Sequence, residues 1–193
     1  MNKRQFLGSA ALAAALPATA APAAAFASKG PTLLTISGAI GKANRSQFDP
    51  VLDQMLKKHK VRFEKALALD FTALTALPAV TIKPTLEYDA RAHALRGPLL
   101  VEVLALAGAK LGDQTALALR AVDGYVASIS VAQARTQRFI IATHLDGQPM
   151  GLGGLGPLWA IIDADRIAHL ATRPLAERFG ACPWALYHID VAG

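Results

Sequence analysis

The alternation of apolar and polar positions predicts several strands, most of them in the second half of the chain. Residues 32–40 (TLLTISGAI) are rich in β-branched side chains and end near a glycine, which is typical of a strand. A second strand-like run, residues 79–88, is interrupted by Pro84. Further strands are predicted at residues 115–122, 125–131, 138–145, 157–163 and 184–191. The dipeptides Asp123-Gly124 and Asp146-Gly147 are typical of the tight turns that connect such strands.

Helical periodicity is clearest at residues 96–110 (RGPLLVEVLALAGAK), where Gly97 and Pro98 are expected to open a helix and Gly108 to close it. The apolar stripe of this helix consists of Leu99, Leu100, Val103, Leu104 and Leu106. Shorter helices are predicted after Asp70 and over residues 174–180.

Another helix is predicted at residues 48–59 (FDPVLDQMLKKH), because Asp49 is a good N-cap and Pro50 suits the first helical position. Its apolar face is expected to comprise Val51, Leu52, Met55 and Leu56. Strands outnumber helices overall, so the sequence predicts an α+β domain with a mixed, largely antiparallel sheet and a few short helices.

The first 27 residues have the pattern of an export signal peptide. Lys3 and Arg4 precede a modest apolar run, residues 8–16, which is too short to span a bilayer. Residues 25–27 (AFA) then form a signal-peptidase pattern, and KRQFLG is similar to a twin-arginine signal with lysine as its first basic residue. We therefore expect cleavage after Ala27, a single domain over residues 28–193, and a periplasmic location with no membrane association after cleavage.

Charge and cysteine usage narrow the range of functions. The formal net charge of the whole chain is +6, and the basic cluster at residues 57–65 has no interleaved aromatic run, so nucleic acid is not an expected partner. The chain holds one cysteine, Cys182, which excludes an intramolecular disulfide. The histidines do not pair at i, i+4 or at zinc-site spacing, and no metal ligand is predicted.

Residues 151–156 (GLGGLG) match the spacing of a dinucleotide-binding loop, but their context excludes that function. The fingerprint requires a helix after the loop, whose N-terminus holds the pyrophosphate. Here Pro157 and a strand-like run follow instead.

Seven segments of the chain support a different interpretation of residues 151–156. They are LTISGAIG, FTALTALPAVTI, LRGPLLVEVLALAGA, RAVDGYVASISV, IATHLDGQPMG, GPLWAIID and WALYHIDV. In this order, over about residues 32–191, they resemble the oxidoreductase molybdopterin-binding domain family, in its small exported single-domain form. The resemblance implies the sulfite-oxidase-like fold, a molybdopterin cofactor carrying molybdenum, and oxidoreductase activity. Because no haem-attachment motif is present, electrons would leave through a redox partner protein in the periplasm.

The resemblance also implies which residues lie at the cofactor-binding face. They are Asp123, Gly124, Tyr125, Gly156, Pro157 and Trp159, to which we add Arg96 because it precedes the expected helix N-terminus, a favourable place for an anion. Two alternatives stay open here: Asp123-Gly124 as a hairpin turn alone, and Tyr125 as a core aromatic residue.

Two departures from the family lead to a second hypothesis. Catalytic members bind molybdenum through a cysteine thiolate expected in or near residues 81–98, where this chain has none. Trp159 stands where many relatives have arginine, so a positively charged phosphate partner is missing. The chain is therefore either a molybdopterin-dependent oxidoreductase or a cofactor-free module that binds a ligand or a partner protein on the same fold, and no catalytic residue is assigned.

Overall fold

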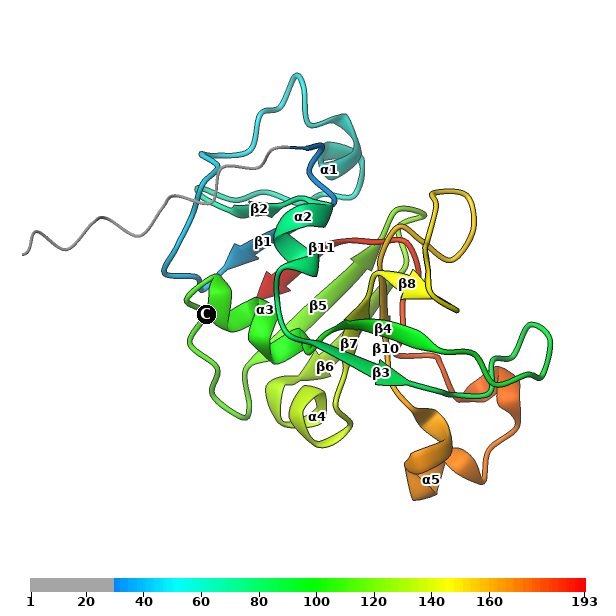
Figure 1. The fold of residues 1–193 in the computed structure, drawn as a ribbon. Coiled ribbons are helices and arrows are strands. Elements are labelled where there is room, and N and C mark those ends of the chain that lie inside the picture. The colour runs from blue at the N-terminus through cyan, green and yellow to red at the C-terminus, as the bar shows by residue number, and fades with distance from the viewer. Residues whose placement is uncertain (1–29) are drawn as a thin grey trace, which may run out of the picture.

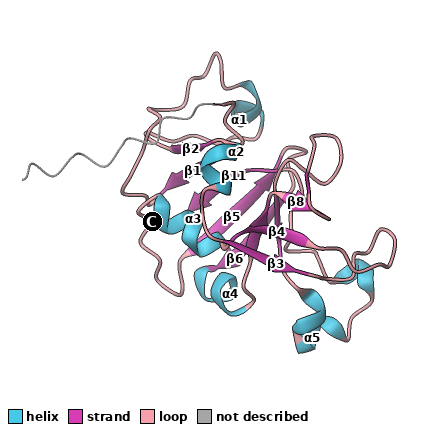
Figure 2. Ribbon diagram, in the orientation of Figure 1, coloured by secondary structure: helices cyan, strands magenta, loops and turns pink. Residues whose placement is uncertain are grey.

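The computed structural model describes residues 30–193, so the predicted signal peptide, residues 1–27, lies outside the described residues. The chain forms short strands and short helices, as Figures 1 and 2 show. The strands are β1 (Leu34–Gly38), β2 (Leu67–Leu69), β3 (Ala79–Ile82), β4 (Leu95–Pro98), β5 (Ala116–Ala121), β6 (Val126–Ser130), β7 (Ile140–Ala142), β8 (His144–Leu145), β9 (Gln148–Pro149), β10 (Trp159–Ile161) and β11 (Leu186–Val191). The helices are α1 (Gln54–Lys58), α2 (Phe71–Thr75), α3 (Leu100–Leu106), α4 (Val131–Thr136) and α5 (Ala168–Ala171), with 3-10 turns η1 (Ala164–Arg166) and η2 (Leu175–Glu177).

The strands form three sheets that confirm the α+β prediction. The five-stranded sheet has the order β2-β1-β11-β5-β6, in which only the β1–β11 pair is parallel. A four-stranded antiparallel sheet has the order β3-β4-β8-β9, and β7 pairs with β10. The two predicted turn dipeptides lie where expected, between β5 and β6 and between β8 and β9. The sheets are therefore mixed but largely antiparallel.

The core lies against one face of the five-stranded sheet. Period-two alternation places Leu117 and Leu119 of β5 on the buried face, next to Ile189 of β11. The predicted stripe of α3 contributes Leu100, Val103 and Leu104, all fully buried, and Gly108 ends this helix with a positive φ of 62°.

The predicted start of the helix at residues 96–110 is wrong. Gly97 and Pro98 belong to β4, where they pair with Val80 and Ala79, and α3 begins only at Leu100. The reason is packing: Gly97 lies so close to the backbone of Ile141 that its position is fixed by the neighbouring strand.

The expected helix over residues 48–59 is reduced to the five-residue α1. The Asp49 carboxylate accepts hydrogen bonds from the backbone N–H groups of Val51 and Leu52, which closes a turn in place of a first helical turn. Val51 and Leu52 are 71% and 80% exposed, so the predicted apolar face is wrong except for Leu56. Leu56 packs in a separate small cluster with Phe48, Val61 and Tyr187.

Asp70 caps α2 as predicted, its side chain accepting from the Ala73 N–H at 2.8 Å. Helix α4 was not predicted, because the run at residues 125–131 continues the strand alternation. Ser130 ends β6 by accepting a hydrogen bond from the Gln133 N–H, which starts α4.

The close approach of β4 and β7 gives a stability prediction. A Cβ at Gly97 would overlap the carbonyl oxygen of Ile141, so Gly97→Ala has to push the two strands apart. We expect the free energy of unfolding, measured by urea denaturation, to fall by at least about 2 kcal/mol. Gly151→Ala is the matched control, because nothing lies within 4 Å of a Cβ there, and it should change stability little. Equal stability of the two variants would contradict this packing.

Candidate functional site

Two adjoining hollows lie between loops that follow or precede the strands. The first encloses about 240 Å³ and is lined by Glu87, Tyr88, Ala121, Asp123, Tyr125, Phe179, Gly180, Cys182, Pro183 and Trp184. The second, of about 450 Å³, shares Tyr88 and Trp184 and is completed by Val122, Leu152, Gly153, Gly154, Leu155 and Ala185. We call the two hollows together the aromatic cleft.

The cleft gathers large apolar side chains that the fold leaves in contact with solvent. Tyr88 is 56% exposed, Tyr125 is 49% exposed, Trp184 is 37% exposed and Leu152 is 75% exposed. Single exposed apolar residues are ordinary, but several around one hollow mark a binding surface. The segments that carry them are far apart in the sequence, and the fold brings them together.

The β5–β6 turn holds one wall of the cleft. The Asp123 carboxylate accepts from the Tyr125 N–H at 2.8 Å, and Gly124 takes a φ of 95°, which favours glycine. The Tyr125 hydroxyl donates to the carbonyl of Gly180, which joins the turn to the segment before β11. Asp123-Gly124 is therefore a hairpin turn that also positions a cleft residue, and the alternative of Tyr125 as a core aromatic residue is wrong.

Tyr88 forms the opposite wall, on the long loop between β3 and β4. Burial, the charge of Glu87 and a hydrogen bond to the Glu87 side chain together raise the pKa of Tyr88 above its ordinary value of 10.0. The phenol is therefore neutral at physiological pH, and Glu87 is held next to the ring.

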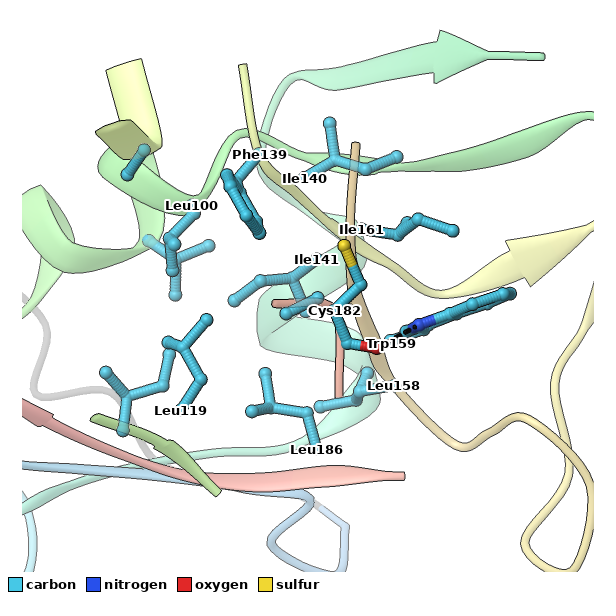
Figure 3. Packing of buried hydrophobic residues seen from close by; sticks show 14 of the residues in the cluster. Leu100, Leu119, Phe139, Ile140, Ile141, Leu158, Trp159, Ile161, Cys182 and Leu186 are labelled. Carbon is cyan, nitrogen blue, oxygen red and sulfur yellow. Dashed lines mark hydrogen bonds between the residues drawn. The ribbon is translucent and has the colours of Figure 1, made fainter. Parts of the chain in front are cut away.

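Trp159 lies behind the cleft in the core and lines neither hollow. It is 1% exposed, and its indole N–H donates to the backbone carbonyl of Cys182 at 2.9 Å (Figure 3). Its ring lies 6.5 Å from that of Tyr88 and 6.4 Å from that of Phe179, measured between centroids. The indole thus packs next to aromatic residues from two different segments that line the cleft.

The only thiol of the chain faces the core, although Cys182 borders the cleft. Its side chain belongs to the buried apolar cluster, and Figure 3 shows the sulfur pointing toward Ile140, Ile141 and Ile161. The residue is 4% exposed, and burial raises the pKa of the thiol to about 12. Because the sulfur lies in the apolar core, this side chain is not placed to bind a metal in the cleft.

The residues around the cleft do not fit a molybdenum–pterin group. Such a group requires a fixed metal ligand and basic or N–H partners for its phosphate. No lysine, arginine or histidine lines either hollow. Within residues 30–193, no group of three histidine, cysteine, aspartate or glutamate residues is placed to hold a metal ion. What the cleft offers is ring faces, aliphatic surface and two carboxylates.

The structure separates the predicted site residues into those at the cleft and those away from it. Asp123 and Tyr125 line it, and Gly124 joins them. Gly156 and Pro157 follow the glycine-rich wall, and a Cβ at Gly156 would collide with the backbone of Met150. Arg96 is an exposed residue of β4 opposite Thr81 and His144, so its expected place at a helix N-terminus is wrong.

Sequence reasoning missed Glu87, Tyr88 and Trp184. They lie in loops, and neither periodicity nor spacing connects residue 88 with residue 184. The available signal was local: Tyr88 and Trp184 are aromatic residues at the ends of the strand-like runs 79–88 and 184–191, next to turn-forming stretches.

Comparison with known proteins identifies no matching family model and no matching curated protein. Among solved structures, the chain is similar to the sulfane dehydrogenase SoxCD from Paracoccus pantotrophus, with a TM-score of 0.52 at 13% sequence identity. The similarity covers 82% of this chain but 37% of that one. The chain thus shares its fold with part of an oxidoreductase, and the activity of that protein is not carried over by this likeness.

An ion-paired histidine fixes the loop that carries Tyr88. The two ring nitrogens of His93 lie 2.7 Å from a carboxylate oxygen of Asp146 and 2.9 Å from one of Asp89. The other Asp146 oxygen accepts from the Ala94 N–H. Hydrogen bonds to Asp146 and then Asp89 raise the pKa of His93 above its ordinary 6.5.

This cluster predicts a pH dependence. Because the folded pKa is raised, the stabilisation by His93 is fully present below the unfolded pKa and is lost as pH rises through the folded value. An NMR titration of the His93 ring should give a pKa above 6.5, and Asp146→Asn should lower it. Asp113→Asn, far from His93 and paired with Arg135, is the control. A His93 pKa at or below 6.5 in the unaltered chain would show that the cluster does not form.

Proposed function

We propose that this chain is a small-molecule binding domain whose ligand lies in the aromatic cleft. The observation that carries the proposal is the gathering of exposed Tyr88, Tyr125 and Trp184 around one hollow that is free of lysine, arginine and histidine. Concave sites with mostly apolar walls and a few placed polar groups are the usual form of small-ligand sites.

The dimensions of the cleft support a small organic ligand. Typical ligand pockets enclose roughly 300–1,000 Å³, and the adjoining hollows of about 240 Å³ and 450 Å³ are of this order. A nucleic-acid strand is not expected there, because stacked bases require basic groups along their phosphates. The glycine-rich wall leaves room for a ligand, since no atom lies within 4 Å of a Cβ at Gly153.

A second candidate is the molybdopterin-dependent oxidoreductase that the sequence resemblance implies. The likeness of fold to a sulfane dehydrogenase and the ordered sequence segments support it. The side chains of the cleft argue against it, because the sulfur of Cys182 lies in the core and no cation lines the cleft for a phosphate. We therefore derive no redox step for this chain.

We further propose that the domain acts in the periplasm after removal of residues 1–27, where its partner is the cleft ligand or a protein that delivers it. The N-terminal pattern of basic, apolar and small residues supports export. In the part of the chain from residue 30 onward, no helix is both long and apolar enough to cross a bilayer.

One purification tests these proposals together. The full chain is expressed in a cofactor-producing bacterium, recovered from the periplasmic extract, and examined by native mass spectrometry and metal analysis. We expect an N-terminus at Ser28, a bound organic molecule and far less than one molybdenum per chain. Trp184→Leu removes one ring of the cleft and should lose the adduct, whereas Glu64→Gln, an exposed residue outside the cleft, should keep it.

Other outcomes would contradict particular parts. About one molybdenum and one pterin per chain would establish the second candidate instead. A chain that carries no adduct, and whose Trp184 stays equally accessible to acrylamide when small-molecule extract is added, would exclude the binding function. An unprocessed N-terminus on protein in the cytoplasm would exclude export.

A further inference from the structure

The first hollow of the aromatic cleft combines ring surface with negative charge. Four of its lining residues are aromatic, Tyr88, Tyr125, Phe179 and Trp184, and its only charged ones are Glu87 and Asp123. The chain as a whole has 20 lysine and arginine residues against 14 acidic ones, so a lining that is solely acidic departs from its average surface. The second hollow adds aliphatic surface from Val122, Leu152 and Leu155.

Neither carboxylate is neutralised by the protein. Within residues 30–193, six aspartates form ion pairs with basic side chains. Neither Glu87 nor Asp123 takes part in any of these ion pairs. One Asp123 oxygen accepts from the Tyr125 N–H, and the charge of Glu87 is among the causes that raise the pKa of Tyr88. Both carboxylates therefore lie beside aromatic rings. A cationic ligand placed there is attracted by the carboxylate and by the face of the ring at the same time.

We propose that the aromatic cleft binds an organic cation whose alkylated ammonium group lies against the rings of Tyr88, Tyr125 and Trp184, near Glu87 and Asp123. Aromatic faces carry the negative end of the ring quadrupole and attract such a charge. This inference rests on the proposed function and names the class of its ligand.

The lining favours an alkylated ammonium over a bare metal ion or a simple ammonium. A compact cation is strongly hydrated and requires several oxygen ligands to replace its water, which the described residues do not group together. Methyl or ethyl groups on the nitrogen spread the charge over a larger surface, so an alkylated ammonium group is weakly hydrated. It therefore loses its water easily when it packs against the faces of aromatic rings. The aliphatic wall of the second hollow then accommodates the uncharged part of the ligand.

A pair of probes of equal shape isolates the charge. Choline carries a quaternary ammonium group, and 3,3-dimethylbutan-1-ol is its uncharged isostere. Binding to the full mature chain is followed by calorimetry and by the fluorescence of Trp184, which is partly exposed while Trp159 is buried. We expect choline to bind at least about tenfold more tightly than the alcohol, with an affinity that falls as salt is raised.

Charge-removing variants complete the test. Asp123→Asn keeps the oxygen that accepts from the Tyr125 N–H but removes the charge, so choline affinity should fall several-fold while that of the alcohol stays unchanged. Glu87→Gln provides a second variant with the same expectation, and Glu64→Gln, an exposed acid outside the cleft, should leave both affinities unaltered.

The outcomes separate this inference from the proposed function. Equal affinity for the two probes would overturn the cation inference and leave a cleft that binds apolar ligands. Loss of choline affinity in Glu64→Gln as large as in Asp123→Asn would also overturn it, because the attraction would then come from overall charge. If neither probe binds, the cation inference fails, and the native mass spectrum decides separately whether the cleft holds any ligand.

Discussion

The hydrogen bond from the Trp159 indole to the Cys182 carbonyl connects the central strand pair to the segment before β11. The bond is buried, and an indole N–H at that depth requires a partner because an unsatisfied donor is costly. The backbone of β10 adds a second link to the same segment, since the Ala160 N–H donates to the Pro183 carbonyl at 3.2 Å. The segment at residues 179–185 is therefore held over the indole, and it brings Phe179 and Trp184 to the cleft while its thiol is directed into the core.

A fold shared with part of a sulfane dehydrogenase does not by itself determine the chemistry of the cleft. The sheets and the loops around the cleft depend on backbone pairing and core packing. The chemistry depends on a few side chains that these loops present. In the cleft, this chain presents tyrosine, tryptophan and carboxylate side chains. Binding of a small ligand needs no more than these groups.

Local patterns predicted those features of the fold that depend on neighbouring residues. The runs at residues 115–122 and 184–191 predicted β5 and β11. β5 alternates because one of its faces is buried, and β11 is apolar in most positions because nearly all of it is buried. Asp70 predicted the start of α2 because its side chain caps the helix through a contact only three residues along the chain. Prediction failed where distant contacts decide the structure, as at Gly97, whose place in β4 is set by its approach to Ile141.

The same distinction holds for the candidate site. Asp123 and Tyr125 were expected at the site from the family resemblance of the segment that contains them, and they line the cleft. Tyr88 and Trp184 meet there only because the folded sheets bring two loops together, so no spacing along the chain connects them. The chemical character of the cleft, in contrast to its position, is therefore a property of the tertiary structure.

The only thiol of the chain belongs to the core and is not available as a ligand in the cleft. The most direct test is the rate at which the native chain reacts with an aromatic disulfide reagent at pH 8, since Cys182 is its only cysteine. Because the side chain is buried and its pKa is raised to about 12, we predict a reaction no faster than unfolding, with full reaction in urea. Reaction of the folded chain at the rate of an exposed cysteine would place the thiol in the cleft and contradict the account.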